Sequence, residues 1–286
     1  MPASIDPGPI CFDGQAVIVT GAGRGLGAAY ARLIAGLGGM VVVHDAGVAQ
    51  DGSGFDPSVA DGVASEIEAA HGTAAACCEN LEDPAACGRV VEFALDRFGR
   101  VDALIHNAGL VAFARLEESE AAFWNRMLAI GVHAPFHLAR AAVPHMRRLG
   151  QGRIVLTTSG RAMRVEDCLP GLAAYSVAKM AQIGLMVGLA AELADANIKV
   201  NAVSPVAATR VLRRSAPELK PELVAPGVAF LASAACTVSG VVLHAAGGRF
   251  SAGRWERNEG VDLGSMPASL DEFAARFAQI VEGRAK

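Results

Sequence analysis

The sequence predicts an α/β fold, in which a doubly wound sheet of seven parallel strands carries helices on both faces. Short apolar runs alternate with longer helical patterns along the chain. The runs are continuously apolar rather than alternating with polar residues, which is typical of parallel strands covered on both faces. A glycine-rich turn links the first run to the first helical pattern, and right-handed crossovers between such units build a doubly wound sheet.

We expect strands at Ala16–Thr20, Met40–His44, Thr73–Cys78, Ala103–His106, Arg153–Thr157, Lys199–Val203 and Val241–Ala245. The helices between them are expected at about Leu26–Leu37, Ser58–Ala70, Pro84–Phe98, Glu120–Leu149, Leu172–Ala194 and Glu222–Ala232. In this interpretation the 286 residues form one domain, with an N-terminal extension at 1–12 and a C-terminal tail at 249–286.

Composition limits the classes of function. The net charge is −4 and no basic block is present, which argues against a nucleic-acid partner. No apolar run reaches the roughly 18 residues that cross a membrane, and the first residues lack a signal-peptide pattern, so we expect a cytoplasmic protein without a membrane partner. The six cysteines show no CxxC spacing, and we propose no metal site.

The segment QAVIVTGAGRGLG, at Gln15–Gly27, predicts a phosphate-binding turn between a strand and a helix. Glycines remove the Cβ atoms where a pyrophosphate must approach the backbone, and the N-terminus of the helix faces the negative charge. We therefore expect a dinucleotide to contact Gly21, Arg24, Gly25, Leu26 and Gly27.

Asp45 ends the second predicted strand, 24 positions after Gly21. An acid at about this spacing, roughly 20 residues, accepts hydrogen bonds from the adenosine ribose hydroxyls. Its charge would also repel a 2′-phosphate, which favours NAD over NADP as the cofactor. Arg24 argues in the other direction, because a guanidinium in the glycine-rich turn could bind a 2′-phosphate.

Further motifs follow the fourth and fifth strands. Asn107, Ala108 and Gly109 end the fourth strand with small residues that let a cofactor approach the backbone. Ser159 follows the fifth strand. Tyr175 and Lys179 form a YxxxK pair on one face of the next helix.

These side chains suit proton exchange with an alcohol. The positive charge of Lys179 is expected to lower the pKa of the Tyr175 phenol. Tyr175 can then exchange a proton with the substrate hydroxyl, while Ser159 hydrogen-bonds the reacting oxygen. The three residues are therefore the candidate catalytic residues.

Together the motifs resemble the short-chain dehydrogenase/reductase family, over roughly Cys11–Gly248. The segments that carry the resemblance are Thr20–Gly27 (TGxxxGxG), Asn107–Gly109, Ser159, Tyr175–Lys179 and Asn201–Pro205. The resemblance implies a Rossmann-type NAD(P) oxidoreductase that interconverts an alcohol and a ketone. It also implies a homodimer or homotetramer that associates through the helices Glu120–Leu149 and Leu172–Ala194.

The resemblance assigns further cofactor contacts. It places Asn80 and Leu81 against the adenine and Lys179 on the nicotinamide ribose, and it makes Tyr175 a cofactor contact as well as a catalytic residue. It also places Pro205, Val206 and Thr209 near the nicotinamide. The segments Leu219–Pro226, Gly247–Arg249 and Arg254–Arg257 resemble one branch of the family. That branch contains the (3R)-hydroxyacyl-CoA dehydrogenase part of multifunctional enzyme type 2 and related bacterial hydroxysteroid dehydrogenases, which implies a 3-hydroxyacyl-CoA or a hydroxysteroid as substrate.

Several positions depart from the family pattern. Gly131 stands where the family has an asparagine that kinks a helix, and glycine can keep such a kink without the side chain. His133 nearby either compensates for the asparagine or packs in the interior. Val206 replaces the glycine of the usual Pro-Gly pair.

Two segments near the expected site also differ from the family. The segment between Ser159 and Tyr175 is longer and carries four charged residues, Arg161, Arg164, Glu166 and Asp167. These charges either face an acidic substrate or are solvated. The lid region Val206–Ala225 is short and basic. A basic lid would suit an anionic substrate, but it would equally suit a surface exposed to solvent.

Three functions are compatible with these observations. The first is an NAD-dependent dehydrogenase of a secondary alcohol, which the intact set of Ser159, Tyr175 and Lys179 favours. The second is an NADP-dependent carbonyl reductase, which Arg24 favours. The third is a catalytically inactive dinucleotide-binding protein, which Gly131 and Val206 favour.

Overall fold

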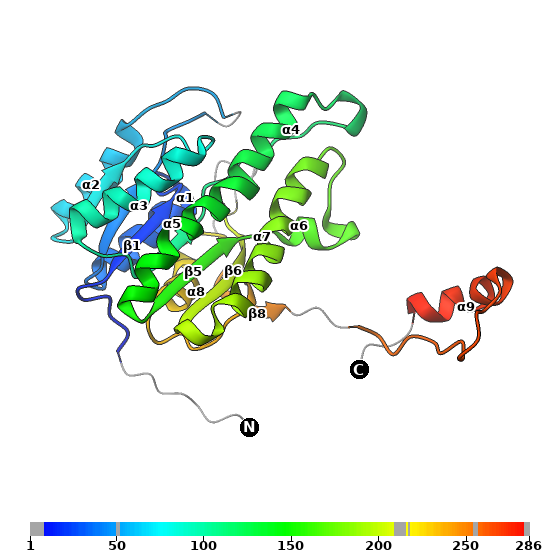
Figure 1. Ribbon diagram of the computed structural model, residues 1–286. Coiled ribbons are helices and arrows are strands. Elements are labelled where there is room, and N and C mark those ends of the chain that lie inside the picture. Colours follow the sequence, from blue (N-terminus) through cyan, green and yellow to red (C-terminus); the bar gives the residue numbers. More distant parts are fainter. Residues whose placement is uncertain (1–8, 50–51, 209–215, 217, 254–256, 283–286) are drawn as a thin grey trace. The chain divides into compact units, whose positions relative to one another are not determined.

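Eight strands form one sheet in the order β3-β2-β1-β4-β5-β6-β7-β8, with helices packed on its two faces (Figure 1). The computed structural model describes residues 9–49, 52–208, 216, 218–253 and 257–282. The strands are β1 (Ala16–Thr20), β2 (Met40–His44), β3 (Thr73–Cys77), β4 (Ala103–His106), β5 (Gly152–Thr157), β6 (Ile198–Val206), β7 (Val242–Ala246) and β8 (Arg249–Gly253). Strands β1 to β7 pair in parallel, as predicted.

The helices are α1 (Gly25–Gly36), α2 (Ser58–Ala69), α3 (Pro84–Phe98), α4 (Ala121–Leu128), α5 (Ala134–Leu149), α6 (Gly160–Met163), α7 (Ala173–Glu192), α8 (Ala225–Ala232) and α9 (Leu270–Glu282). Short 3-10 turns lie at Leu116–Glu118, Val165–Asp167, Ala194–Ala196 and Pro221–Leu223. A π-helical segment, Ala129–His133, joins α4 to α5. The single helix expected at Glu120–Leu149 is therefore three consecutive segments.

The prediction of seven strands was one too few. The additional strand, β8, lies in the segment expected to be the tail. Gly247 and Gly248 join it to β7 and have φ values of +54° and +79°. A two-residue turn with both φ positive reverses the chain into a hairpin, so β8 runs antiparallel to β7. β8 is largely exposed and lacks an apolar run, which explains why hydropathy did not indicate a strand.

Alternate strand residues feed two separate cores, one on each face of the sheet. Val17 and Val19 of β1 pack with α1, α2 and α8, whereas Ile18 packs with α3, α5 and α7. All three side chains are fully buried. Because successive strand residues point to opposite faces, only a continuously apolar strand can fill both cores.

The sheet order reverses between β1 and β4, which are neighbours although two strands separate them in sequence. The register pairs Thr20 with His106, so the carboxyl ends of β1 and β4 lie side by side. In doubly wound sheets, ligands bind in the crevice outside such a reversal. The fold therefore places the glycine-rich turn after β1 next to the Asn107–Gly109 segment after β4.

Among the described helices, α7 has the length and apolar composition that would suit a membrane span. It packs against β5 and β6 and carries Tyr175 and Lys179, both of which are buried. Its inward face belongs to the protein core, which accounts for part of its apolar composition.

The chain divides into two compact units, Met1–Ala252 and Gly253–Lys286. In the second unit, α9 exposes Phe273, Phe277 and Val281. The side-chain amide of Asn258 donates to the Ile280 carbonyl oxygen at 2.7 Å, which ties the start of this unit to the helix. The tail expected at 249–286 thus contains both β8 and α9.

Candidate active site

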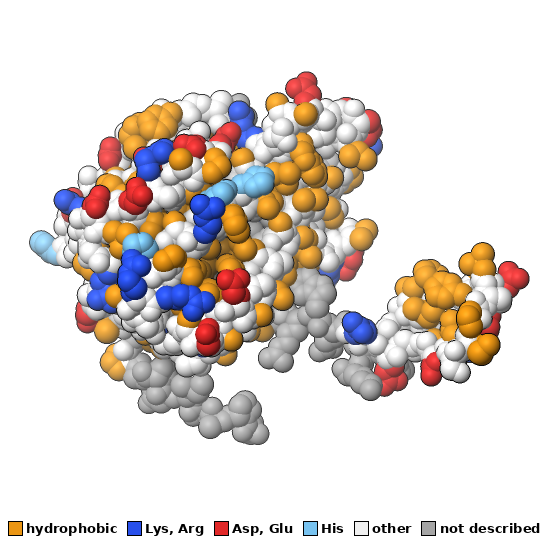
Figure 2. All heavy atoms as spheres, in the orientation of Figure 1, with side chains coloured by type: hydrophobic (Ala, Val, Ile, Leu, Met, Phe, Trp, Pro, Cys, Tyr) orange, Lys and Arg blue, Asp and Glu red, His pale blue; other side chains and the backbone are white. Residues whose placement is uncertain are grey.

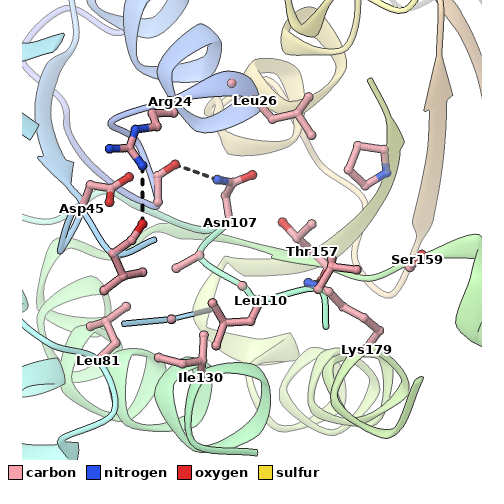
Figure 3. A pocket seen from close by; sticks show the side chains of 18 of the residues that line it. Arg24, Leu26, Asp45, Leu81, Asn107, Leu110, Ile130, Thr157, Ser159 and Lys179 are labelled. Carbon is pink, nitrogen blue, oxygen red and sulfur yellow. Dashed lines mark hydrogen bonds between the residues drawn. The ribbon is translucent and has the colours of Figure 1, made fainter. Parts of the chain in front are cut away.

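One cleft of about 360 Å³ at the carboxyl ends of the strands brings the predicted site residues together. Figure 3 shows Arg24, Asp45 and Leu81 at one end of the cleft and Ser159 and Lys179 at the other. The predicted residues that line it are Gly21, Arg24, Gly25, Leu26, Asp45, Asn80, Leu81, Asn107, Ala108, Gly109, Ser159, Tyr175, Lys179, Pro205 and Val206. Gly27 is buried in the first turn of α1 behind the cleft, and Thr209 lies outside the described residues.

The glycine-rich turn needs glycine because the backbone packs closely there. Gly21 has φ +65°, and a Cβ atom on it would lie 2.9 Å from the Cα of Ala108. A Cβ atom on Gly27 would lie 2.7 Å from the Asn107 side-chain nitrogen. Side chains at these positions would separate the turn from the β4 segment. The missing Cβ atoms also leave the backbone N–H groups at the N-terminus of α1 accessible to an anion.

The hydroxyl group of Thr20 joins the ends of β1 and β4. It accepts hydrogen bonds from the backbone N–H groups of Asn107 and Ala108, both at 3.1 Å. It also lies 3.1 Å from Nδ1 of His106. The Asn107 amide donates to the Gly21 carbonyl oxygen at 2.9 Å (Figure 3), so both segments that flank the cleft are fixed to each other.

His106 is a site residue for which the sequence indicated no role. Its ring is fully buried, and Nε2 lies 3.3 Å from the Ile130 carbonyl oxygen in the π-helical segment. Since the Thr20 hydroxyl already accepts two N–H groups, its own hydrogen is available to Nδ1, which leaves the ring N–H on Nε2 to donate to Ile130. Burial, with the charge of Lys179, lowers the pKa of His106 to about 3, so the ring is neutral at physiological pH.

The π-helical segment replaces the asparagine kink that the family pattern led us to consider. Gly131 lies in this segment, and a Cβ atom on it would be 2.5 Å from the Cβ of Ala178 on α7. This close approach excludes a longer side chain. His133 is exposed, so the expectation that it packs in the interior is wrong, and it does not line the cleft. The histidine that contacts this segment is His106, through the Ile130 carbonyl oxygen.

Asp45 connects the adenosine end of the predicted site to the glycine-rich turn. Its two carboxylate oxygens accept hydrogen bonds from the backbone N–H groups of Gly23, at 3.0 Å, and Gly47, at 2.8 Å. Each oxygen keeps a second lone pair for a ligand hydroxyl. Arg24 points to the same end, where its guanidinium donates to the Val48 carbonyl oxygen at 3.4 Å (Figure 3).

Ser159, Tyr175 and Lys179 meet at the other end of the cleft. Ser159 caps α6, because its Oγ accepts a hydrogen bond from the backbone N–H of Arg161 at 3.3 Å. Lys179 lies one helical turn after Tyr175, with Nζ 5.9 Å from the centre of the Tyr175 ring. The Lys179 ammonium donates to the Thr157 carbonyl oxygen at 2.9 Å.

The electrostatics of this group differ from the sequence-based expectation in one respect. We expect Lys179 to lower the pKa of Tyr175, but the pKa of Tyr175 is raised. Burial raises it more than the hydrogen bond with Ser159 and the charge of Arg161 lower it. Burial also lowers the pKa of Lys179 to about 8. Desolvation therefore opposes the charged form of both groups.

Among the described residues, no group of three or more His, Cys, Asp or Glu side chains is placed to hold a metal ion. The cleft instead combines a backbone cradle, an acid and two hydroxyl groups beside a lysine. That combination suits a dinucleotide and an alcohol or ketone.

Comparison with known proteins identifies the family. The chain matches the sequence profile of the short chain dehydrogenases over residues 15–218. The protein belongs to the short-chain dehydrogenase family. It is therefore an oxidoreductase, as the motifs predicted.

Three similar proteins illustrate the range of the family. A short-chain type dehydrogenase/reductase of Mycobacterium tuberculosis is 35% identical over 273 residues, 94% of each chain. Peroxisomal multifunctional enzyme type 2 of Mus musculus is 37% identical, over 88% of this chain but only 34% of its own length. The solved 7α-hydroxysteroid dehydrogenase complex with NADH and 7-oxo glycochenodeoxycholic acid has a TM-score of 0.74 and 29% identity, over 83% of this chain and 95% of that chain.

His106→Leu should destabilise the protein by about 1–3 kcal/mol, because it leaves the buried Thr20 hydroxyl and Ile130 carbonyl without their partner. Urea unfolding monitored by circular dichroism measures the change. The matched control is His133→Leu. His133 is an exposed residue at the end of the same π-helical segment, so the substitution should alter stability by less than about 0.5 kcal/mol. Equal effects of the two substitutions would contradict the proposed contact.

Proposed function

We propose that this protein is an NAD-dependent dehydrogenase that interconverts a secondary alcohol and a ketone. The observation that carries the proposal is the convergence of Ser159, Tyr175 and Lys179 in a cleft whose opposite end presents Asp45 and the glycine-rich turn. Neither a pair of hydroxyl groups alone nor a glycine-rich turn alone would support this function. Their position in one cleft supports a bound dinucleotide and a reacting oxygen at adjacent places.

Residues along the whole length of the cleft would contact the dinucleotide. The backbone at Gly21, Arg24, Gly25, Leu26 and Gly27 would bind the pyrophosphate at the N-terminus of α1. Asp45 would accept the ribose hydroxyls, and Asn80 and Leu81 would contact the adenine. The nicotinamide end would be surrounded by Asn107, Ala108, Gly109, Pro205, Val206 and Thr209. When bound, the nicotinamide supplies the hydride acceptor or donor of the reaction.

Tyr175 would act as the general acid and base. During oxidation its deprotonated phenol takes the proton of the substrate hydroxyl, and Ser159 donates a hydrogen bond to the same oxygen. Because burial raises the pKa of Tyr175, the phenolate requires a positive charge close by. Lys179 would supply that charge and would also bind the nicotinamide ribose.

Asp45 supports NAD rather than NADP. Both carboxylate oxygens are already oriented by backbone N–H groups, so the negative charge is held at the place where a 2′-phosphate would lie. Two like charges at hydrogen-bond distance repel each other strongly in a partly buried site. Arg24 lies at the same end and is the residue through which NADP could still bind.

For the substrate, we propose a 3-hydroxyacyl-CoA or a hydroxysteroid. The similarity to multifunctional enzyme type 2 and to a hydroxysteroid dehydrogenase supports these two classes. Since the chain spans only a third of the mouse enzyme, the activities of that whole enzyme are not assumed. The apolar side chains of Leu110 and Val111 in the cleft wall suit the hydrocarbon part of either substrate.

We also propose a cytoplasmic protein with one dehydrogenase domain, in which the unit Gly253–Lys286 belongs to the C-terminal tail of that domain. We propose that it forms a homodimer or homotetramer through α5 and α7. Hydrophobic side chains gather over these two helices on the face shown in Figure 2. Phe136 and Leu149 of α5 and Val177 and Val187 of α7 are each between 39% and 56% exposed. An exposed apolar patch of this kind is typical of a protein interface.

Tyr175→Phe tests the reaction. With NAD⁺ and a panel of a (3R)-hydroxyacyl-CoA, a hydroxysteroid and a simple alicyclic alcohol, the wild-type protein should form NADH. The variant should lose roughly 100-fold or more of that turnover, because it lacks the group that accepts the proton.

The wild-type protein and the Tyr175→Phe variant should bind NADH with similar affinity, which fluorescence titration measures. Binding without any turnover by the wild-type protein would instead support the inactive dinucleotide-binding protein that Gly131 and Val206 suggested.

The cofactor preference forms a separate test. NADH should bind more than about tenfold more tightly than NADPH, which corresponds to roughly 1.4 kcal/mol. Asp45→Asn should reduce this preference, since it removes the charge but keeps an oxygen for a backbone N–H group. Arg24→Ala is the matched control at the same end of the cleft. Tighter binding of NADPH that is lost in Arg24→Ala would support the NADP-dependent reductase.

A further inference from the structure

The segment between Ser159 and Tyr175 carries four charged residues, and the structure separates them into two groups. Arg164 forms ion pairs with Glu166, at 3.7 Å, and with Asp167, and its side chain is 64% exposed. These three residues form a solvated surface cluster. Arg161 takes no part in it and lies in α6 instead, where it lines the cleft.

Arg161 is placed beside the reacting groups by the same turn that places Ser159. Its backbone N–H donates to the Ser159 Oγ at 3.3 Å, and its side chain is half-buried in the cleft wall. The positive charge of Arg161 lowers the pKa of Tyr175, although burial outweighs it. Arg161 and Tyr175 both line this cleft.

The other cations around the cleft already have partners. Arg24 donates to the Val48 carbonyl oxygen, Lys179 donates to the Thr157 carbonyl oxygen, and Arg126 pairs with Glu82 at 3.3 Å. For Arg161, no ion pair or side-chain hydrogen bond occurs within the described part of the chain. The guanidinium donors of Arg161 are therefore available to an anionic ligand in the cleft.

We propose that Arg161 determines substrate specificity by binding a carboxylate that lies near the carbinol carbon of the substrate. Arg161 and Ser159 are two residues apart on one turn, so the carboxylate and the reacting oxygen would belong to the same short segment of the substrate. The planar guanidinium fork matches a carboxylate with two parallel hydrogen bonds. The substrate class is therefore a short hydroxy acid and its keto acid. This inference rests on the proposed dehydrogenase function, but it replaces the two substrate classes suggested by similarity, because neither a thioester nor a hydroxysteroid carries a free carboxylate next to the carbinol carbon.

The test uses three substrates that share one carbon skeleton: 3-hydroxybutyrate, its methyl ester and its CoA thioester. The wild-type protein should prefer the free acid. Arg161→Met should lower kcat/KM for the acid by roughly 10- to 100-fold, the loss expected for one hydrogen-bonded charge pair, chiefly through KM. The loss on the ester should be much smaller. Arg161→Lys should restore part of the preference for the acid.

Arg164→Met is the matched control, because it removes an arginine from the same segment that is already paired at the surface. It should leave the preference for the acid unchanged. A second readout does not need turnover: acetoacetate, but not methyl acetoacetate, should raise the Tm of the NAD⁺-saturated wild-type protein. That increase should be absent in Arg161→Met.

The outcomes separate this inference from the function on which it rests. Equal losses on the acid and the ester, a preference for the thioester that survives Arg161→Met, or no effect of acetoacetate on Tm would each overturn the role of Arg161. In those cases, NADH binding together with turnover of neutral alcohols would leave the dehydrogenase function standing. Absence of both NADH binding and turnover would overturn the dehydrogenase function itself.

Discussion

The candidate site depends on the hydroxyl group of Thr20, which is shared by three partners where the sheet order reverses. It accepts two backbone N–H groups from the segment after β4 and lies against His106, which in turn contacts the Ile130 carbonyl. β1, β4 and the π-helical segment are thereby fixed to one another. The glycine-rich turn follows β1, and the Asn107–Gly109 segment follows β4. The π-helical segment packs against α7, which carries Tyr175 and Lys179. The spacing between the two ends of the cleft follows from this one buried network.

The buried ammonium of Lys179 shows that the site is not arranged for stability. Its pKa falls from 10.5 to about 8 through burial, so an unfolded chain binds this proton more readily than the folded protein. The folded state is therefore penalised below about pH 8, and the penalty decreases as the pH rises towards 10. Such costs are common where a protein holds charges ready for a ligand.

The parts that the sequence predicted are those encoded by short local patterns. The glycine-rich turn, Asp45, Ser159 and the YxxxK pair each follow a strand or occupy one helix face, so spacing alone placed them in one cleft. The parts that were missed depend on contacts between distant segments. His106 gains its role only because β4 lies beside β1, and the raised pKa of Tyr175 reflects burial that no spacing encodes. Likewise, the four charged residues of one loop could not be divided into a surface cluster and a cleft arginine without coordinates.

The central claim is that a dinucleotide binds at the reversal between β1 and β4. Hydrogen–deuterium exchange with and without NADH tests it most directly, because it reports on each backbone segment independently of the substrate. The account predicts slower exchange in the glycine-rich turn, in the residues after Asp45 and in the Asn107–Gly109 segment when NADH is added. Unchanged exchange in these segments, or protection confined to segments that do not line the cleft, would contradict it.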